Sequence, residues 1–182
     1  MRFFHYTVGM KLESIKRSGF LKTSPEKPKP REKSLVWLST NPVWEVTAAK
    51  AAYESSTNKQ RLLSKEEMAN ELGGLFRFVI DSETYPDTIY PWVRLPTVAR
   101  IPKIIKDRLV KRAKLAKADP MEWAGVLGVI QVERTTLEKL VNGIWEFVSM
   151  ADAQVGTSTG KSTIVDGGTS MPSTIQTSDW NR

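Results

Sequence analysis

The residue of this chain best suited to ligand chemistry is His5, its only histidine, which stands in the aromatic segment Phe3-Phe4-His5-Tyr6-Thr7. A neutral imidazole donates a hydrogen bond from one ring nitrogen and accepts one at the other, so it can hold a polar ligand in an apolar cleft. A lone histidine on a buried strand can equally be a core residue bonded to a backbone carbonyl. The residues around His5 therefore have to be considered to distinguish these two interpretations.

Two further groups of residues combine aromatic and polar side chains. One is Val36-Trp37-Leu38-Ser39-Thr40-Asn41-Pro42, followed by Trp44, Glu45 and Thr47. The other is residues 118–123, which lead into Gln131-Val132-Glu133. Taken singly, the tryptophans can be core aromatics whose indole N–H finds a carbonyl, and Ser39 to Pro42 can be a capping turn. Their order after His5 is what favours a shared site.

Composition excludes several classes of function. The chain has no cysteine and one histidine, so it can form no disulfide, thiolate metal site or cysteine nucleophile, and we expect no zinc site. No run of about 20 apolar residues indicates a transmembrane helix, and the N-terminus does not resemble a signal peptide. We therefore expect a soluble, cytoplasmic protein without a metal or a membrane partner.

The pattern of apolar residues predicts an α+β fold with small split antiparallel sheets and short helices. Branched and aromatic residues between turn formers predict strands at 2–7, 35–40, 75–80, 123–131 and 144–149. Helices are expected at 12–20, ended by Gly19, at about 44–53, at 65–72 and within 100–117. The proline-containing segments 25–33 and 85–97 are expected to be irregular.

The chain divides into one domain, residues 1–150, and a Ser-, Thr- and Gly-rich tail, residues 151–182, whose composition is typical of a flexible segment. Within the tail, residues 156–162 look like a phosphate-binding loop. The spacing between the glycines is one residue short, however, and the flanking sequence predicts neither the preceding strand nor the following helix. We interpret this stretch as low-complexity sequence.

Positive charge is concentrated in one segment. The chain carries a net charge of +7, and from Arg100 to Lys117 eight Lys or Arg residues accompany one acid, Asp107. This segment can be an amphipathic helix that packs Ile101, Ile105 and Leu109 inward and exposes its charges to solvent. It can also be a patch that contacts nucleic acid or an acidic protein, with the candidate residues Lys103, Lys106, Lys111 and Arg112.

The groups at 3–7 and 36–48 together resemble the ADP-ribosyltransferase-like fold, which binds NAD between two small sheets. They look most like an uncharacterised bacterial and phage branch, which opens on an HYT strand and continues with a VWLSTNPVWE-like segment. The resemblance covers about residues 2–55, the block 118–133 only loosely, and the tail not at all. It implies a protein that uses NAD as a substrate and needs no metal.

The resemblance also implies a role for individual residues. The family's opening histidine bonds the ribose next to nicotinamide and corresponds to His5, which Tyr6 and Thr7 follow, the Thr7 backbone being available to the carboxamide. The family's second strand supports the nicotinamide ring and orients the catalytic acid, and its residues correspond to Trp37, Ser39 and Thr40. Ser39 is thereby a candidate for catalysis as well as for cofactor binding.

The family's catalytic glutamate has no direct counterpart in this chain. A fixed carboxylate stabilises the positive charge that develops on the sugar as nicotinamide leaves. Alignment on Trp123 puts the expected position at or near Gly128, which has no side chain. Gln131 and Glu133 offer a substitute, because a Gln-x-Glu pair occurs in the arginine-modifying branch and alternate residues of a strand share a face. Glu133 can also be a solvated strand end, and Glu146 is a weaker candidate.

Two functions are therefore open. In the first, the protein is an NAD-dependent ADP-ribosyltransferase that modifies an acidic protein or a nucleic acid, as a phage or mobile-element effector would. In the second, it is a catalytically silent protein on the same scaffold that binds a host protein or nucleic acid through its basic helix.

Overall fold

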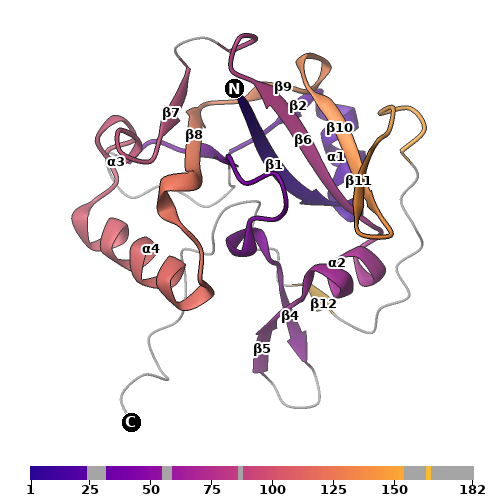
Figure 1. Cartoon of the computed structure of the whole chain (residues 1–182), viewed down its shortest axis with the longest axis horizontal. Coiled ribbons are helices and arrows are strands. Elements are labelled where there is room, and N and C mark those ends of the chain that lie inside the picture. The colour runs from indigo at the N-terminus through magenta and orange to yellow at the C-terminus, as the bar shows by residue number, and fades with distance from the viewer. Residues whose placement is uncertain (24–31, 55–58, 86–87, 154–162, 165–182) are drawn as a thin grey trace.

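An antiparallel sheet forms the centre of the computed structural model, which describes residues 1–23, 32–54, 59–85, 88–153 and 163–164. Within these residues the sheet has seven strands in the order β11-β10-β6-β1-β3-β8-β7 (Figure 1). They are β1 (Arg2–Val8), β3 (Leu35–Ser39), β6 (Leu75–Asp81), β7 (Ile89–Pro91), β8 (Trp123–Leu127), β10 (Thr136–Val141) and β11 (Ile144–Phe147).

Smaller sheets and short helices complete the described part of the chain. One small sheet contains β2 (Phe20–Leu21) and β9 (Ile130–Gln131), and another contains β12 (Thr163–Ile164), β4 (Ala51–Glu54) and β5 (Lys59–Leu62). The helices are α1 (Gly9–Ser18), α2 (Lys65–Glu71), α3 (Leu95–Val98) and α4 (Lys103–Ala116), with 3-10 turns η1 (Val46–Ala48), η2 (Pro120–Glu122) and η3 (Val132–Arg134). The predicted α+β fold with several antiparallel sheets is confirmed.

β1 is bound unequally by its two neighbours in the main sheet. It pairs with β6 along its whole length, from Arg2↔Asp81 to Val8↔Leu75. In the described part of the chain, Phe4↔Ser39 is the one register at which it pairs with β3. The sheet therefore consists of two halves, β11-β10-β6-β1 and β3-β8-β7, which meet around Phe4 and separate beyond it.

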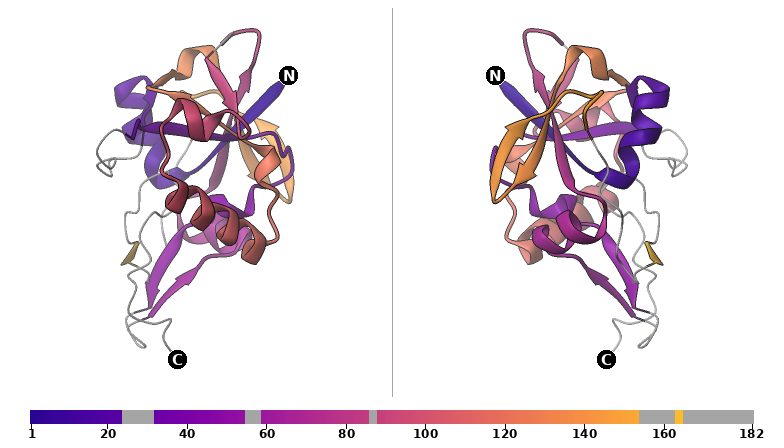
Figure 2. Two further views of the ribbon diagram at one scale, coloured as in Figure 1. Left: turned by 90° about the vertical axis from the view of Figure 1, so that its left-hand side faces the viewer. Right: turned by 90° about the vertical axis from the view of Figure 1, so that its right-hand side faces the viewer.

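Different elements cover the two faces of the sheet (Figure 2). On one face, α1 and β9 pack against a buried core that includes Phe3, Val36, Phe76 and Phe78. On the other face, α3 and α4 cover a tryptophan-rich cluster around Trp123, and α2 covers a third cluster below β1 and β6. Because successive strand residues point to opposite faces, neighbouring residues of β1 reach different surroundings.

The expected helix at about 44–53 is wrong. The chain forms the 3-10 turn η1 there and then enters β4, which pairs with β5. Alanine has the highest helix propensity, but propensity is a weak determinant of structure and tertiary contacts override it. Here the Glu45 side chain caps η1 by accepting from the Thr47 N–H, and the Lys50 N–H donates to Met68 Sδ.

The expected strand at 123–131 is interrupted. β8 ends at Leu127, and Gly128 adopts a φ of 93°, a conformation that glycine tolerates and other residues rarely do. The chain turns there and pairs again as β9 with β2. The helix end at Gly19 and the basic helix are confirmed, since Gly19 has a φ of 71° and α4 packs Ile105 and Leu109 inward.

Residues 40–48, which we call the strap, follow β3 across the sheet face opposite α1. Three consecutive carbonyl oxygens of the strap accept hydrogen bonds from side chains of three different strands. Tyr6 Oη donates to the Asn41 oxygen at 2.6 Å, Arg77 to the Pro42 oxygen, and Trp145 Nε1 to the Val43 oxygen at 3.0 Å. The Asn41 side chain also accepts from the N–H groups of Val43 and Trp44.

Arg77 is the central donor of this arrangement. Its guanidinium lies 4.4 Å from the ring centroids of both Phe4 and Trp145, and its Nε donates to Glu138 at 2.5 Å. The Arg77 side chain is 9% exposed and that of Glu138 is 20% exposed, so this ion pair is largely withdrawn from water. A planar guanidinium suits the position because it can stack between two rings while it donates in its own plane.

We expect Arg77→Met to lower the free energy of unfolding by about 2–3 kcal/mol, because it leaves the Glu138 charge largely buried without its partner. The double variant Arg77→Met/Glu138→Gln should recover part of this loss, since no lone charge remains. Urea unfolding of both variants measures the difference. Equal stability of the single and double variants would show that the ion pair contributes little.

Candidate functional site

His5 lies where β1 and β3 begin to separate. Its side chain is buried, and its Nδ1 lies 2.9 Å from the Trp37 carbonyl oxygen, so the ring joins the two strands one residue beyond their backbone pair. A carbonyl can only accept, so Nδ1 carries the proton in this bond. The neutral ring then has an unprotonated Nε2, which is a hydrogen-bond acceptor suited to a hydroxyl group.

The surroundings keep His5 uncharged. Burial lowers its pKa to about 4; the hydrogen bond to Trp37 opposes this shift, and the positive charge of Lys50 adds to it. At neutral pH the ring therefore acts as a neutral donor and acceptor. It is no source of positive charge at the site.

Thr7 faces the same side of β1 as His5 and is also buried. Its hydroxyl has no hydrogen-bond partner among the described residues. A buried polar group without a partner is unfavourable, so the Thr7 hydroxyl is a candidate for contact with a ligand or an ordered water molecule. His5 and Thr7 together form the polar part of this side of β1.

Tyr6 faces the opposite side of β1 and contacts the strap. Its hydroxyl donates to Asn41, and its ring makes edge contacts with Trp44 at 5.0 Å between centroids. Burial raises the pKa of Tyr6 to about 12, against the effect of the neighbouring Arg77 guanidinium. Of the three residues predicted to bind NAD from β1, the structure thus brings His5 and Thr7 together and places Tyr6 elsewhere.

The residues predicted from β3 also divide between two places. Trp37 is half-buried and bonds His5 through its carbonyl, while its ring packs edge-on against Trp123. Ser39 is buried on the strap side, and the Thr40 hydroxyl donates to the Glu122 carbonyl oxygen at 3.3 Å. Of these three residues, Trp37 is the one whose backbone carbonyl accepts a hydrogen bond from the His5 ring within the described part of the chain.

Ser39 does orient an acid, but that acid is Glu45. Ser39 Oγ donates to Glu45 Oε2 at 3.0 Å, and the Thr47 N–H and hydroxyl donate to Oε1 at 3.0 and 2.5 Å. The Glu45 carboxylate is buried and both its oxygens are engaged, so its evident role is to hold the strap and cap η1. The sequence holds no specific signal for this role, because the contacts of Glu45 depend on how the strap folds back on Ser39.

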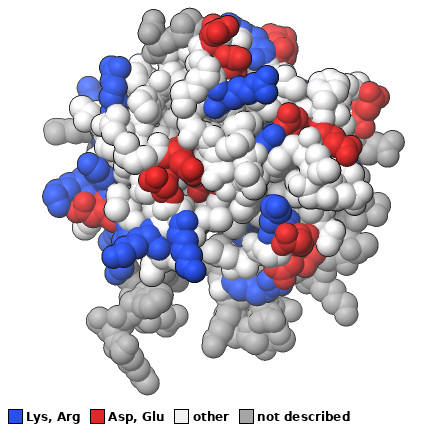
Figure 3. All heavy atoms as spheres, viewed as in Figure 1, with Lys and Arg blue, Asp and Glu red and all other residues white. Residues whose placement is uncertain are grey.

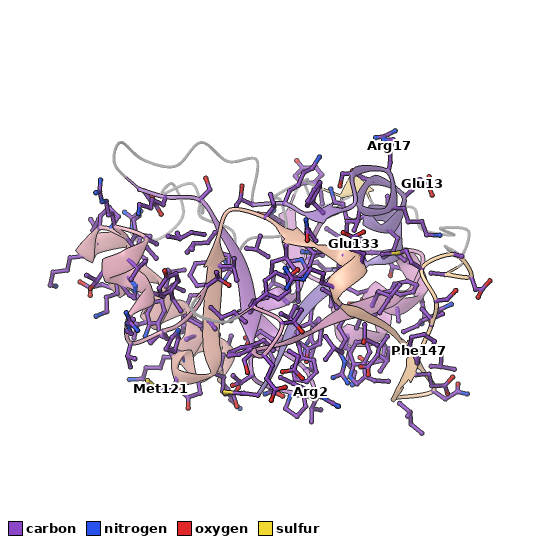
Figure 4. All side chains as sticks on the ribbon, turned by 90° about the horizontal axis from the view of Figure 1, so that it is seen from above. Arg2, Glu13, Arg17, Met121, Glu133 and Phe147 are labelled. Atoms are coloured by element: carbon purple, nitrogen blue, oxygen red, sulfur yellow. The ribbon has the colours of Figure 1, made fainter. Side chains whose placement is uncertain are left out.

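Glu133 does not share a strand face with Gln131. β9 ends at Gln131, and Glu133 lies exposed in η3, the turn that leads toward β10 (Figure 4). Its charge acts on Tyr85, whose ring also contacts Arg134 at 4.8 Å. The expectation that period-two alternation aligns Gln131 with Glu133 is therefore wrong, because the backbone turns between them.

The other positions considered for the acid lie apart from His5. Gly128 sits in the turn after β8, where an added side chain would meet open space. Glu146 is exposed on β11, and β6 and β10 separate that strand from β1. In the described part of the chain, the acid that the sequence places in the motif and the structure buries is Glu45.

The candidate basic residues all lie on α4 but differ in environment. Lys106 and Lys111 are exposed, and Lys103 pairs with Asp107 at 2.7 Å. Arg112 is half-buried, and burial lowers its pKa. Arg112 is therefore the least exposed of the four candidate residues.

Two residues near the site were not predicted from the sequence. Lys50 acts on the pKa of His5, and Arg77 holds the strap against β1. Neither stands in a motif with a recognisable spacing, so only the fold reveals them. Across the described residues, no group of three or more His, Cys, Asp or Glu side chains could hold a metal ion, and no helix is long and apolar enough to cross a membrane.

Because His5 is the only histidine of the chain, its titration can be followed without assignment. We expect its imidazole to titrate near pH 4 by nuclear magnetic resonance, with the Nδ1–H tautomer above that pH. In the unfolded chain it titrates near 6.5, so the folded state loses stability as the pH falls from about 6.5 to about 4. The loss amounts to about 3 kcal/mol at most.

His5→Asn is the matched control for this pH dependence, because the Asn amide can still donate to Trp37 but does not titrate. Subtracting its urea unfolding energies from those of the wild type should isolate the contribution of His5. A His5 that titrates at or above pH 6 would mean that the ring is open to solvent.

Comparison with known proteins adds no assignment to these residues. No family model, curated protein or solved structure matches the chain. The resemblance to ADP-ribosyltransferases rests on the residues of the two motifs, and the function has to be argued from the site itself.

Proposed function

We propose that the protein binds NAD where β1 and β3 separate, and that it transfers the ADP-ribose unit to a macromolecular acceptor. The observation that carries this proposal is the fixed, neutral tautomer of His5. With Nδ1–H engaged by Trp37, Nε2 accepts a hydrogen bond from a ribose hydroxyl of NAD. The Thr7 hydroxyl, which lacks a partner among the described residues, supplies a second polar contact on the same side of the strand.

The charge near His5 supports a nucleotide as the ligand. Lys50 is close enough to lower the pKa of His5, and its ammonium group would attract the pyrophosphate of a dinucleotide. The Trp37 ring packs against Trp123 on the other face of the sheet, so Trp37 contributes to this site through its carbonyl oxygen, which holds the His5 tautomer. These features bind and orient NAD, but none of them stabilises the positive charge that develops on the sugar.

A second function, a catalytically silent protein that binds a partner through α4, is favoured by the position of the acids. Glu133 lies exposed in the turn η3, and Glu45 already accepts three hydrogen bonds. If neither carboxylate reaches the ribose, NAD can bind without being cleaved. The two functions therefore differ in the transfer step, and binding of a partner through α4 does not depend on NAD.

We expect His5→Asn to weaken NAD binding about tenfold, because it keeps the bond to Trp37 and removes the Nε2 acceptor. Calorimetric titration with NAD measures the affinity. Incubation with labelled NAD and cell lysate then measures transfer, which should fall in His5→Asn and disappear in Glu133→Gln.

Transfer that persists in both variants would remove His5 and Glu133 from the proposed site. NAD binding without transfer in the wild type would overturn the transfer step. If the wild type neither binds NAD nor transfers label, the NAD proposal fails and the silent protein that binds a partner through α4 is favoured.

Thr7→Val provides an independent measure of the same side of β1. Without a ligand, the variant should be more stable by about 1 kcal/mol, because a buried hydroxyl without a partner is replaced by a methyl group. With NAD, it should bind more weakly than the wild type. Stability by urea unfolding and affinity by calorimetry must move in opposite directions; a variant that loses both would point to a packing defect.

A further inference from the structure

The outer face of α4 carries a line of exposed side chains that is apolar at its ends and cationic at its centre. Ile104, Arg108, Lys111 and Leu115 follow one another at intervals of four, three and four residues, which places them along one side of a helix. We call these four residues the α4 stripe. All are exposed, and Ile104 and Leu115 are 57% and 74% exposed.

The stripe is distinct from the side of α4 that packs against the protein. Ile105, Leu109 and Ala113 face inward, toward the cluster around Trp92 and Trp123. The ion pair between Lys103 and Asp107 uses the acid of this helix. In Figure 3, blue side chains gather over α4 at the lower left, with little red among them. The outer face of α4 is thus positively charged and contains two large aliphatic side chains.

This combination points to one class of partner. Arg108 and Lys111 attract carboxylates or phosphates alike. Exposed Ile104 and Leu115 gain nothing against a phosphate backbone, but they lose contact with water when they pack against apolar side chains. Protein interfaces commonly combine apolar anchors with complementary charges, whereas contacts to the nucleic-acid backbone are polar and salt-dependent.

We infer that the α4 stripe docks an acidic segment of a partner protein that carries apolar residues on either side of its carboxylates. Ile104 and Leu115 anchor the segment, and Arg108 and Lys111 pair with its acidic residues. The inference holds whether or not NAD is consumed, because it uses no residue of the His5 site.

Selection of a random peptide display library on the full-length protein tests this inference. We expect the enriched peptides to combine several Asp or Glu residues with at least two large apolar residues. Their affinity, measured by fluorescence anisotropy with the synthetic peptide, should fall about tenfold or more in Ile104→Ser/Leu115→Ser. Arg108→Gln/Lys111→Gln should weaken binding at low salt and reduce its dependence on salt.

Val110→Ser is the matched control, because Val110 is exposed on α4 outside the stripe. It should leave peptide affinity within about twofold. His5→Asn should also leave it unchanged, so failure of the NAD proposal would not affect this result. A library that yields no acidic, apolar peptides, or peptides indifferent to Ile104→Ser/Leu115→Ser, overturns the inference. So does tight binding of labelled RNA or DNA that depends on Lys111 but not on the two aliphatic residues.

Discussion

Three backbone carbonyl groups in succession, those of Asn41, Pro42 and Val43, are held by Tyr6, Arg77 and Trp145. The rest of this region depends on that constraint. A segment without regular secondary structure must place its inward-facing carbonyl groups against donors, and here the donors come from β1, β6 and β11. The strap consequently fixes the end of β3, the position of Ser39 and the orientation of Glu45. It also covers the face of β1 that does not carry His5.

These hydrogen bonds explain why the segments 3–7 and 36–48 occur together in one chain. They do so without requiring that both segments bind a ligand. Tyr6 and the segment from Ser39 to Thr47 recognise each other within the protein, through Asn41 and the ring of Trp44. A resemblance carried by these residues is therefore first a resemblance of fold. His5 and Thr7 are different, because they lie on the other face of β1 and take no part in holding the strap. The evidence for a ligand rests on these two residues and on the Trp37 carbonyl oxygen, which holds the tautomer of His5.

The sequence was sufficient to predict helices and strands that local interactions stabilise. It was insufficient for segments whose structure depends on pairing with a distant strand. β6 and α4 have strong patterns of apolar residues, and Gly19 ends α1 because it can adopt a positive φ. The alanine-rich stretch after Trp44 has helical propensity, yet it pairs with β5 instead. At the site, the presence of a histidine at position 5 indicated a polar contact. The tautomer of His5 and the proximity of Lys50 follow only from the fold, in which β1 and β3 separate beyond Phe4. The turn at η3 is another case, since no local signal separates it from a continued strand.

The distribution of acids has a consequence for how the protein could act. A catalytic carboxylate must be held close to the ribose and must keep an oxygen available for it. Glu45 is held rigidly, but it lies on the strap side, away from the face of β1 that carries His5, and both its oxygens are engaged. Glu133 is open to solvent but lies in a short turn. Catalysis therefore requires either that the turn η3 moves toward bound NAD or that the acceptor completes the site. Binding requires neither, because His5 is already held in the tautomer that accepts a hydroxyl. For the function proposed here, NAD binding is thus the simpler step, and the position of Glu133 in the bound state would decide between an enzyme and a silent protein.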